Sequence, residues 1–211
     1  MISKQILNGV ALFAFSLGLC LNPRFAAGDG TSQYWDIPSG GPGGPWNLVS
    51  PSWSLNPAGG SQVAWANGSN AVFSASDLNA TGNFTVTLAA NVTVGDLTYT
   101  GGSLGSTLQI AAGVGTNSIT MAAATMNVTV DSLTTLVVGP SIAGPGSLVL
   151  QNGTLVLTGA NTYSGDTTIS AGTLQAGSTT AFSPNSAFTV NSVLDLNVTP
   201  TPWVHWRVTE P

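Results

Sequence analysis

The acidic side chains are the first candidates for chemistry, because glycoside hydrolysis needs two carboxylates that face one substrate. Asp77 and Asp96 lie nineteen residues apart, an interval that recurs elsewhere in the chain. If the chain coils with this period, the two side chains stack on one edge as an acid pair or a Ca²⁺ site. Aspartate is also a frequent turn residue, and we favour that interpretation. A polysaccharide lyase would further need a nearby Lys or Arg, and the chain has neither between Arg24 and Arg207.

Other reactive residue types are scarce. The one histidine, His205, sits in an irregular C-terminal stretch, so a serine triad, which needs a positioned histidine, is not favoured. The one cysteine, Cys20, falls in an apolar N-terminal run, and a chain without that run can form neither a disulfide nor a thiolate metal site. The glycine-rich stretch at 40–44 lacks a flanking strand and helix and is not a phosphate loop. We therefore expect no catalytic residue, no metal site and no cofactor.

Four tryptophans near the N-terminus are the most suggestive cluster of binding residues. They are Trp35, Trp46, Trp53 and Trp65. If their ring faces are exposed they can stack on sugar rings, which makes them candidate ligand-binding residues for a carbohydrate. The alternative is a cap, because a coiled repeat fold must cover its open apolar end. Tryptophan is highly buried on average, so we favour the cap.

The elements that must position these residues follow from the spacing of the glycines. "GTL" begins at Gly153 and again at Gly172, nineteen residues later. Successive intervals of five to seven residues separate the glycines at 139, 146, 153, 159, 165, 172 and 177. Each gap holds a strand of four or five residues and a turn, but no helix. Three gaps make a unit of nineteen or twenty residues. The spacing predicts an all-β, three-sided parallel β-helix with about 19–20 residues per coil.

Alternation within each side predicts which residues face the core. Leu148 and Leu150 share one face of their expected strand, and Leu155 and Leu157 share one face of the next. Further back, the apolar residues of 84–88 alternate with Thr85 and Thr87. The Asn-Gly step at 152–153 is also a strong hairpin signal, and taken alone it favours a β-sandwich. The nineteen-residue recurrence favours a corner of the coil, where Asn and Gly fit equally well because both tolerate positive φ.

Composition narrows the classes of partner. Charged residues are only 5% of the 211 residues and the formal net charge is −5, whereas an ordinary soluble domain carries about 25% charged residues. So few Lys and Arg side chains cannot neutralise a phosphate backbone, which excludes nucleic acid as a partner. Hydrophobic residues make up 43% of the chain, enough for a sizeable core.

A cleaved secretory signal peptide is expected at residues 1–28. A basic start precedes an apolar run of signal-peptide length, and Ala26 and Gly28 fit the small residues before a cleavage site. An uncleaved anchor and a lipoprotein signal at Cys20 are weaker alternatives, because the run is short and Leu19 precedes the cysteine. No other stretch reaches membrane-spanning length, so the mature chain is expected outside the cytoplasm.

The stretch "GTLVLTGANTYSGDTTISAGTLQAG" at 153–177 resembles the autotransporter-associated β-strand repeat of bacterial surface proteins. Its main departure is Asp166, which stands where that repeat usually has glycine. Residues 35–73 are similar, more loosely, to the Trp-rich start of such passengers. The resemblance implies a right-handed parallel β-helix that is exported and displayed at the outer membrane. The expected domains are a signal peptide at 1–28, a Trp/Gly-rich cap at 29–75, β-helix repeats at 76–198 with the best repeat at 146–177, and an irregular tail at 199–211.

These observations predict an exported, non-enzymatic surface protein, adhesin-like or structural, and a passenger fragment without its translocator barrel. Its outward Thr, Ser and Asn rows would bind glycans or other cell-surface components weakly and at many points. Its coil ends would allow self-association. The alternative is a carbohydrate-binding or carbohydrate-active β-helix that uses Asp77 and Asp96 as its acids.

Overall fold

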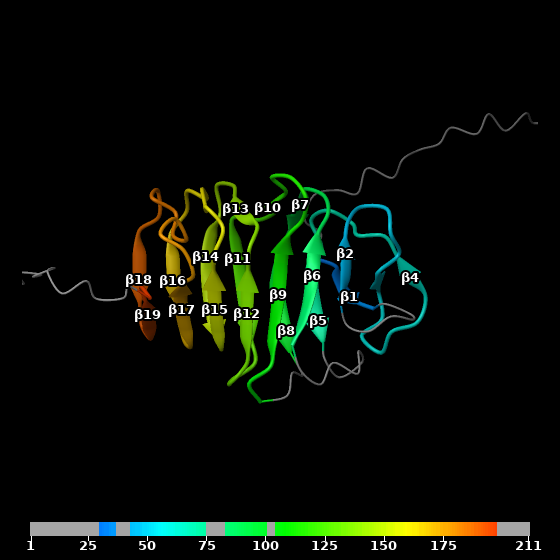
Figure 1. The fold of residues 1–211 in the computed structure, drawn as a ribbon, viewed down its shortest axis with the longest axis horizontal. Coiled ribbons are helices and arrows are strands. Elements are labelled where there is room, and N and C mark those ends of the chain that lie inside the picture. The colour runs from blue at the N-terminus through cyan, green and yellow to red at the C-terminus, as the bar shows by residue number, and fades with distance from the viewer. Residues whose placement is uncertain (1–29, 37–42, 75–82, 101–103, 198–211) are drawn as a thin grey trace, which may run out of the picture.

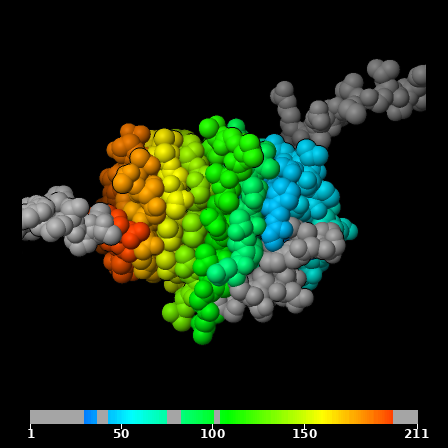
Figure 2. All heavy atoms as spheres, viewed as in Figure 1, coloured from blue at the N-terminus to red at the C-terminus, as the bar shows by residue number. Residues whose placement is uncertain are grey.

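The chain forms a three-sided coil of parallel strands in the computed structural model, which describes residues 30–36, 43–74, 83–100 and 104–197. These residues contain nineteen strands and no helix. In Figure 1 the strands from β5 to β19 follow one another along the longest axis coil by coil, and β4 lies at the opposite end, beyond β1 and β2. Figure 2 shows the same order as successive colour bands. The predicted all-β solenoid is confirmed.

Three sheets form the sides of the coil. The nine-stranded sheet has the order β18 (Phe188–Val190), β16 (Thr167–Ile169), β14 (Ser147–Asn152), β11 (Thr125–Val130), β8 (Leu97–Thr100), β5 (Asn70–Ser74), β1 (Ser32–Trp35), β3 (Trp53–Ser54) and β4 (Gln62–Val63). The seven-stranded sheet has the order β19 (Val193–Asp195), β17 (Thr173–Ala176), β15 (Thr154–Leu157), β12 (Thr135–Val138), β9 (Thr107–Ala112), β6 (Phe84–Leu88) and β2 (Gly44–Trp46). The three-stranded sheet has the order β13 (Ser141–Ala143), β10 (Ser118–Met121) and β7 (Val92–Val94). All paired strands are parallel except β1 with β3 and β3 with β4.

The predicted period holds in the C-terminal coils and fails in the N-terminal ones. Leu136 pairs with Leu155 and Leu155 with Leu174, a step of nineteen residues each time, and Leu174 pairs with Leu194 after twenty. Further back, Leu108 pairs with Leu136 after twenty-eight residues, and other early steps are also longer than twenty. Between Leu108 and Leu136, most of the additional residues lie in the corners at 113–117 and 131–134, where a longer loop does not disturb strand pairing.

The Asn-Gly step at 152–153 forms a corner and not a hairpin. β14 on one side of it pairs with β11 and β16, whereas β15 on the other side pairs with β12 and β17 in a different sheet. Gly153 has a φ of +68°, and a Cβ there would lie 2.6 Å from the carbonyl oxygen of Val130. Both the backbone conformation and the close approach require glycine.

The core consists of inward-facing side chains stacked from coil to coil. Leu148, Leu150, Leu155 and Leu157 are all fully buried, as their alternation predicts. One row of this kind runs along the seven-stranded sheet, where one inward leucine follows another in register: Leu108, Leu136, Leu155, Leu174 and Leu194.

The predicted signal peptide at 1–28 and the predicted tail at 199–211 lie outside the described residues. Within the described ranges, the structure contains no helix with the length and apolar character needed to cross a membrane.

Candidate functional site

The four N-terminal tryptophans converge at the first coil, as their clustering in the sequence suggests. Trp35 ends β1, Trp46 ends β2, Trp53 begins β3, and Trp65 follows β4. Their exposed fractions are 2%, 0%, 0% and 4% in that order. Trp53 is the centre of the group, with its ring centroid 5.0 Å from that of Trp35, 5.1 Å from Trp46 and 4.6 Å from Trp65. Phe73 of the next coil packs beneath them, 5.4 Å from Trp53.

The polar atoms of these rings are buried with them. The indole N–H of Trp65 donates to Oδ1 of Asn67 at 3.2 Å. The buried indole N–H groups of Trp46 and Trp53 have no hydrogen-bond acceptor among the described residues. An unmatched buried donor costs about 1–3 kcal/mol, so the packing of the rings must offset that cost.

This arrangement has the properties of a cap on the first coil. Stacking on a sugar needs an exposed ring face, and all four rings are enclosed by one another and by Phe73. Sugar stacking by Trp35, Trp46, Trp53 and Trp65 stays a hypothesis that would need the cap to open.

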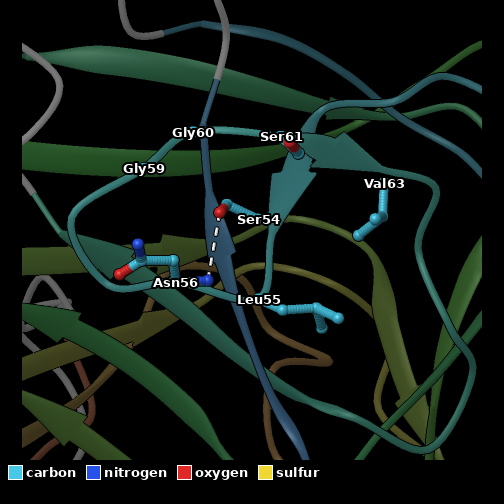
Figure 3. A pocket seen from close by; sticks show the side chains of 7 residues that line it. All are labelled: Ser54, Leu55, Asn56, Gly59, Gly60, Ser61 and Val63. Carbon is cyan, nitrogen blue, oxygen red and sulfur yellow. Dashed lines mark hydrogen bonds between the residues drawn. The ribbon is translucent and has the colours of Figure 1, made fainter.

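A shallow hollow of about 380 Å³ lies outside the cap, in the loop between β3 and β4. Figure 3 shows its lining, which contains no aromatic ring: Ser54, Leu55, Asn56, Gly59, Gly60, Ser61 and Val63. The carboxylate of Asp36 holds this loop, because its Oδ2 accepts from the backbone N–H of Gly60 at 3.0 Å and from Nε2 of Gln62 at 3.1 Å. The hollow thus lacks both a stacking platform and a free acid among its lining residues.

The predicted acid pair cannot be assembled from the described residues, because Asp77 lies outside them. Asp96 has a structural role at a corner of the coil. Its Oδ1 accepts from the backbone N–H of Asn127 at 2.8 Å and from Nδ2 of the same residue at 3.1 Å. Its own N–H donates to Oδ1 of Asn70 at 2.8 Å. Three successive coils are joined in this way.

The described residues also provide no set of ligands for a metal ion. Among the described residues, no group of three or more His, Cys, Asp or Glu side chains is placed to hold a metal ion. His205 lies outside these residues.

Asparagine side chains have a structural role that the sequence analysis missed. Five of them accept a backbone N–H from a neighbouring coil: Asn67 from Thr93, Asn70 from Asp96, Asn83 from Thr107, Asn91 from Ser118 and Asn161 from Ile142. The partners are 19 to 27 residues apart, so no local pattern reveals them. One signal was present, since Asn83 and Asn91 directly precede strands β6 and β7.

A regular polar surface lies on the outward side of the seven-stranded sheet. One column consists of threonines paired in register from coil to coil: Thr107, Thr135, Thr154 and Thr173. The neighbouring outward column is Gln109, Val137, Val156 and Gln175. We call these eight residues the threonine face. Its side chains are half-buried or exposed, and none is charged.

The threonine face combines hydrogen-bonding groups with methyl groups at a fixed repeat. Paired strands are about 4.8 Å apart, so each coil presents one threonine hydroxyl at that interval. The next residue after Gln175 in its column is Asp195, whose carboxylate accepts from Nε2 of Gln175 at 2.7 Å. This hydrogen bond, with one from the backbone of Asn197, lowers the pKa of Asp195. A surface of this kind is suited to many weak contacts with a neutral polar polymer and has no reactive group.

Comparison with known proteins shows which family the repeat resembles and where it lies in the chain. A family model described as the passenger-associated-transport-repeat matches residues 151–176, which run from the end of β14 to the end of β17. The adhesin BmaC autotransporter of Brucella suis biovar 1 (strain 1330) is 34% identical over 162 residues, which cover 72% of this chain and 4% of that protein. No solved structure matches the chain.

The two matches agree with the coil that the structure shows. The family model covers the region where the nineteen-residue step is most regular, and the alignment to the adhesin extends over most of the chain. The chain is therefore a repeat protein of the autotransporter passenger type.

Proposed function

We propose that this chain is an exported, non-enzymatic surface protein with an adhesin-like role, and that the threonine face is its contact surface. The observation that carries the proposal is the register of Thr107, Thr135, Thr154 and Thr173, which repeats one hydroxyl in each of four coils. The relative with 34% identity is named as an adhesin, which supports the same role.

The non-enzymatic part of the proposal is supported by the state of the acids. Asp36, Asp96 and Asp195 all accept hydrogen bonds from neighbouring coils or loops, which fixes them as structural groups. A general acid would instead need a raised pKa and an open cleft. Asp195 has a lowered pKa.

The binding expected from such a surface is weak per contact and additive over many. A hydrogen bond exchanged with water contributes only about 0.5–1.5 kcal/mol net, so a single chain would bind a glycan poorly. Many chains on one cell would bind together with much greater avidity. Because the face has no charged residue, adhesion should depend little on salt.

The test uses beads that carry many copies of the chain and a surface coated with a neutral polysaccharide, such as a galactomannan. Thr154→Glu adds a charge to the centre of the threonine face. The matched control is Thr129→Glu, which adds the same charge to an outward residue of β11 in the nine-stranded sheet. We expect Thr154→Glu to abolish bead adhesion and Thr129→Glu to leave it unchanged.

Two outcomes would contradict the proposal. Equal adhesion of both variants would remove the threonine face as the contact surface. Release of reducing sugar from the coating would show an enzyme, and Asp96→Asn would then separate catalysis from structure, because the amide keeps the Oδ1 acceptor.

A further inference from the structure

The two ends of the coil differ in how the core is covered. At the C-terminal end, Val190 pairs with the fully buried Ile169 of the previous coil, and yet its exposed fraction is 44%. Leu194 pairs with the fully buried Leu174 and is only partly buried, and Leu196 just beyond it is 52% exposed. The inward row of the last coil is therefore open to solvent.

The strands of this last coil also have free edges. β18 and β19 are the terminal strands of their sheets, so one edge of each has no partner strand among the described residues. At the other end, the antiparallel strands β3 and β4 extend the sheet past the first coil, beside the tryptophan rings. An exposed apolar edge of this kind is a site where another segment can pair.

We propose that residues 203–208 of this chain cover the open end as an added strand. Apolar and polar residues alternate there: Val204, Trp206 and Val208 would share one face, and His205 and Arg207 the other. That period of two predicts a strand with one apolar side. Its apolar side would lie on Val190, Leu194 and Leu196.

The connection is long enough for this placement. Five residues, 198–202, separate the last described residue from Trp203 and reach up to about 17 Å when extended. They include Pro200 and Pro202, which lack the N–H that a continued β19 would need. In the proposed placement the chain would leave β19 and return across the coil end.

Two arguments favour this segment over a second copy of the chain. A stable interface between proteins uses about 20–30 residues a side, whereas the open coil end offers only a few apolar side chains. A segment joined by five residues has an effective concentration in the millimolar range. Charge also agrees, because Arg207 is the one cation in residues 25–211 and Asp195 lies on the edge strand β19.

The test rests on the two tail tryptophans, which the alternation places on opposite faces. Trp206→Ser removes the ring expected to lie on the core, and Trp203→Ser removes the ring expected to face solvent. In the full chain, we expect Trp206→Ser to lower the Tm by about 5 °C and to increase binding of a dye for exposed apolar surface. Trp203→Ser should change neither.

Fluorescence quenching by acrylamide gives an independent readout. The four N-terminal rings are buried, so in the Trp203→Ser variant the only additional emitter is Trp206. If Trp206 lies on the coil end, almost no emission of that variant is quenchable. A readily quenched fraction in Trp203→Ser, with no Tm loss in Trp206→Ser, would overturn the proposal. A dimer in the full chain that Val190→Glu makes monomeric would also overturn it, in favour of a second copy.

Discussion

The two halves of the coil reach the same three-sided form by different means. In the regular half, residues 135–195, each coil takes nineteen to twenty-one residues and glycines form the corners. A Cβ on Gly172 would lie 2.1 Å from the carbonyl oxygen of Gly153 one coil below. In the variable half, residues 30–130, the coils are longer, and asparagine side chains and tryptophan rings hold them together.

This difference shows two ways to specify a corner. A glycine corner works by exclusion, because the backbones approach so closely that no side chain fits. An asparagine corner works by attraction, because the amide supplies the hydrogen bonds that an irregular loop leaves unmade. The first way fixes coil length, and the second tolerates insertions.

The largest expected effect tests whether the halves unfold separately. Trp53→Ala removes the ring at the centre of the cap and should cost about 3–5 kcal/mol. Since stability in a stacked repeat is shared mainly between neighbours, hydrogen exchange should show lost protection in β1–β6 and retained protection in β15–β17. Leu174→Ala is the converse variant and should affect the regular half first. Equal loss across both halves in either variant would mean that they form one cooperative unit.

The next effect tests exclusion at the corners. Gly172 has a φ of +81° and would collide with Gly153, whereas Gly115 has a φ of +105° and open space around it. Both alanine variants carry the strain of a positive φ, about 1–2 kcal/mol. Gly172→Ala should cost about 1–3 kcal/mol more, because it also overpacks the corner. Urea unfolding measures the difference, and equal costs would refute exclusion.

The third effect tests whether attraction also matters in the regular half. Asn161 is buried, accepts from the N–H of Ile142 and donates to the carbonyl of Ala181. Asn161→Ala leaves both backbone groups unpaired and should cost about 2–3 kcal/mol. Asn91→Ala is the control, because Asn91 is exposed and water can replace its bond to Ser118. Similar unfolding free energies for the two variants would contradict this account.

The fourth effect depends on pH and is confined to the regular half. Burial raises the pKa of Tyr163, although hydrogen bonding with Thr167 and Ser186 opposes the shift. Folding therefore favours the protonated phenol. The contribution of Tyr163 to the free energy of unfolding is fully present at pH values below about 10, the pKa of tyrosine in the unfolded chain. It is lost as pH rises above that value through the folded pKa. Urea titrations from pH 8 to 11.5 should show a decline that Tyr163→Phe reduces.

The smallest expected effect is an increase in stability from a substitution at the boundary between the halves. Leu133 has a φ of +66° and is 73% exposed, so its side chain packs little while its backbone is strained. Leu133→Gly should remove about 1–2 kcal/mol of backbone strain from the folded chain. The greater entropy of glycine in the unfolded chain should cost about 0.5–1 kcal/mol, so a small net stabilisation remains. The Tm should rise by about 2 °C. Leu104, 79% exposed in the adjacent coil, is the control, and Leu104→Gly should not raise it.

The regular half could be predicted from the sequence because its determinants are local. The glycine spacing around Gly153 and Gly172 gave the coil length, and the alternation at Leu155 and Leu157 gave the core face. Even the Asn-Gly step, which favoured a hairpin by itself, was resolved by the recurrence around it.

The variable half could not be predicted in the same detail, because its determinants are contacts between distant residues. Asn91 bonds to Ser118, and Trp53 packs on Phe73, through a loop geometry that no short pattern encodes. The threonine face was only partly visible: outward threonines were expected, but their alignment depends on registers that set Thr107 opposite Thr135 across a longer coil.

The one-dimensional pairing of the strands has a mechanical consequence. From β5 to β19, every strand bonds only to strands one coil away, and the described ends of the chain lie at opposite ends of the long axis. A pulling force between those ends acts across the ladder bonds of one coil at a time, so coils detach singly. Each coil of twenty residues that detaches adds roughly 65 Å of extended chain. A cell held through such a protein would be on a tether that yields in steps and absorbs work before it breaks.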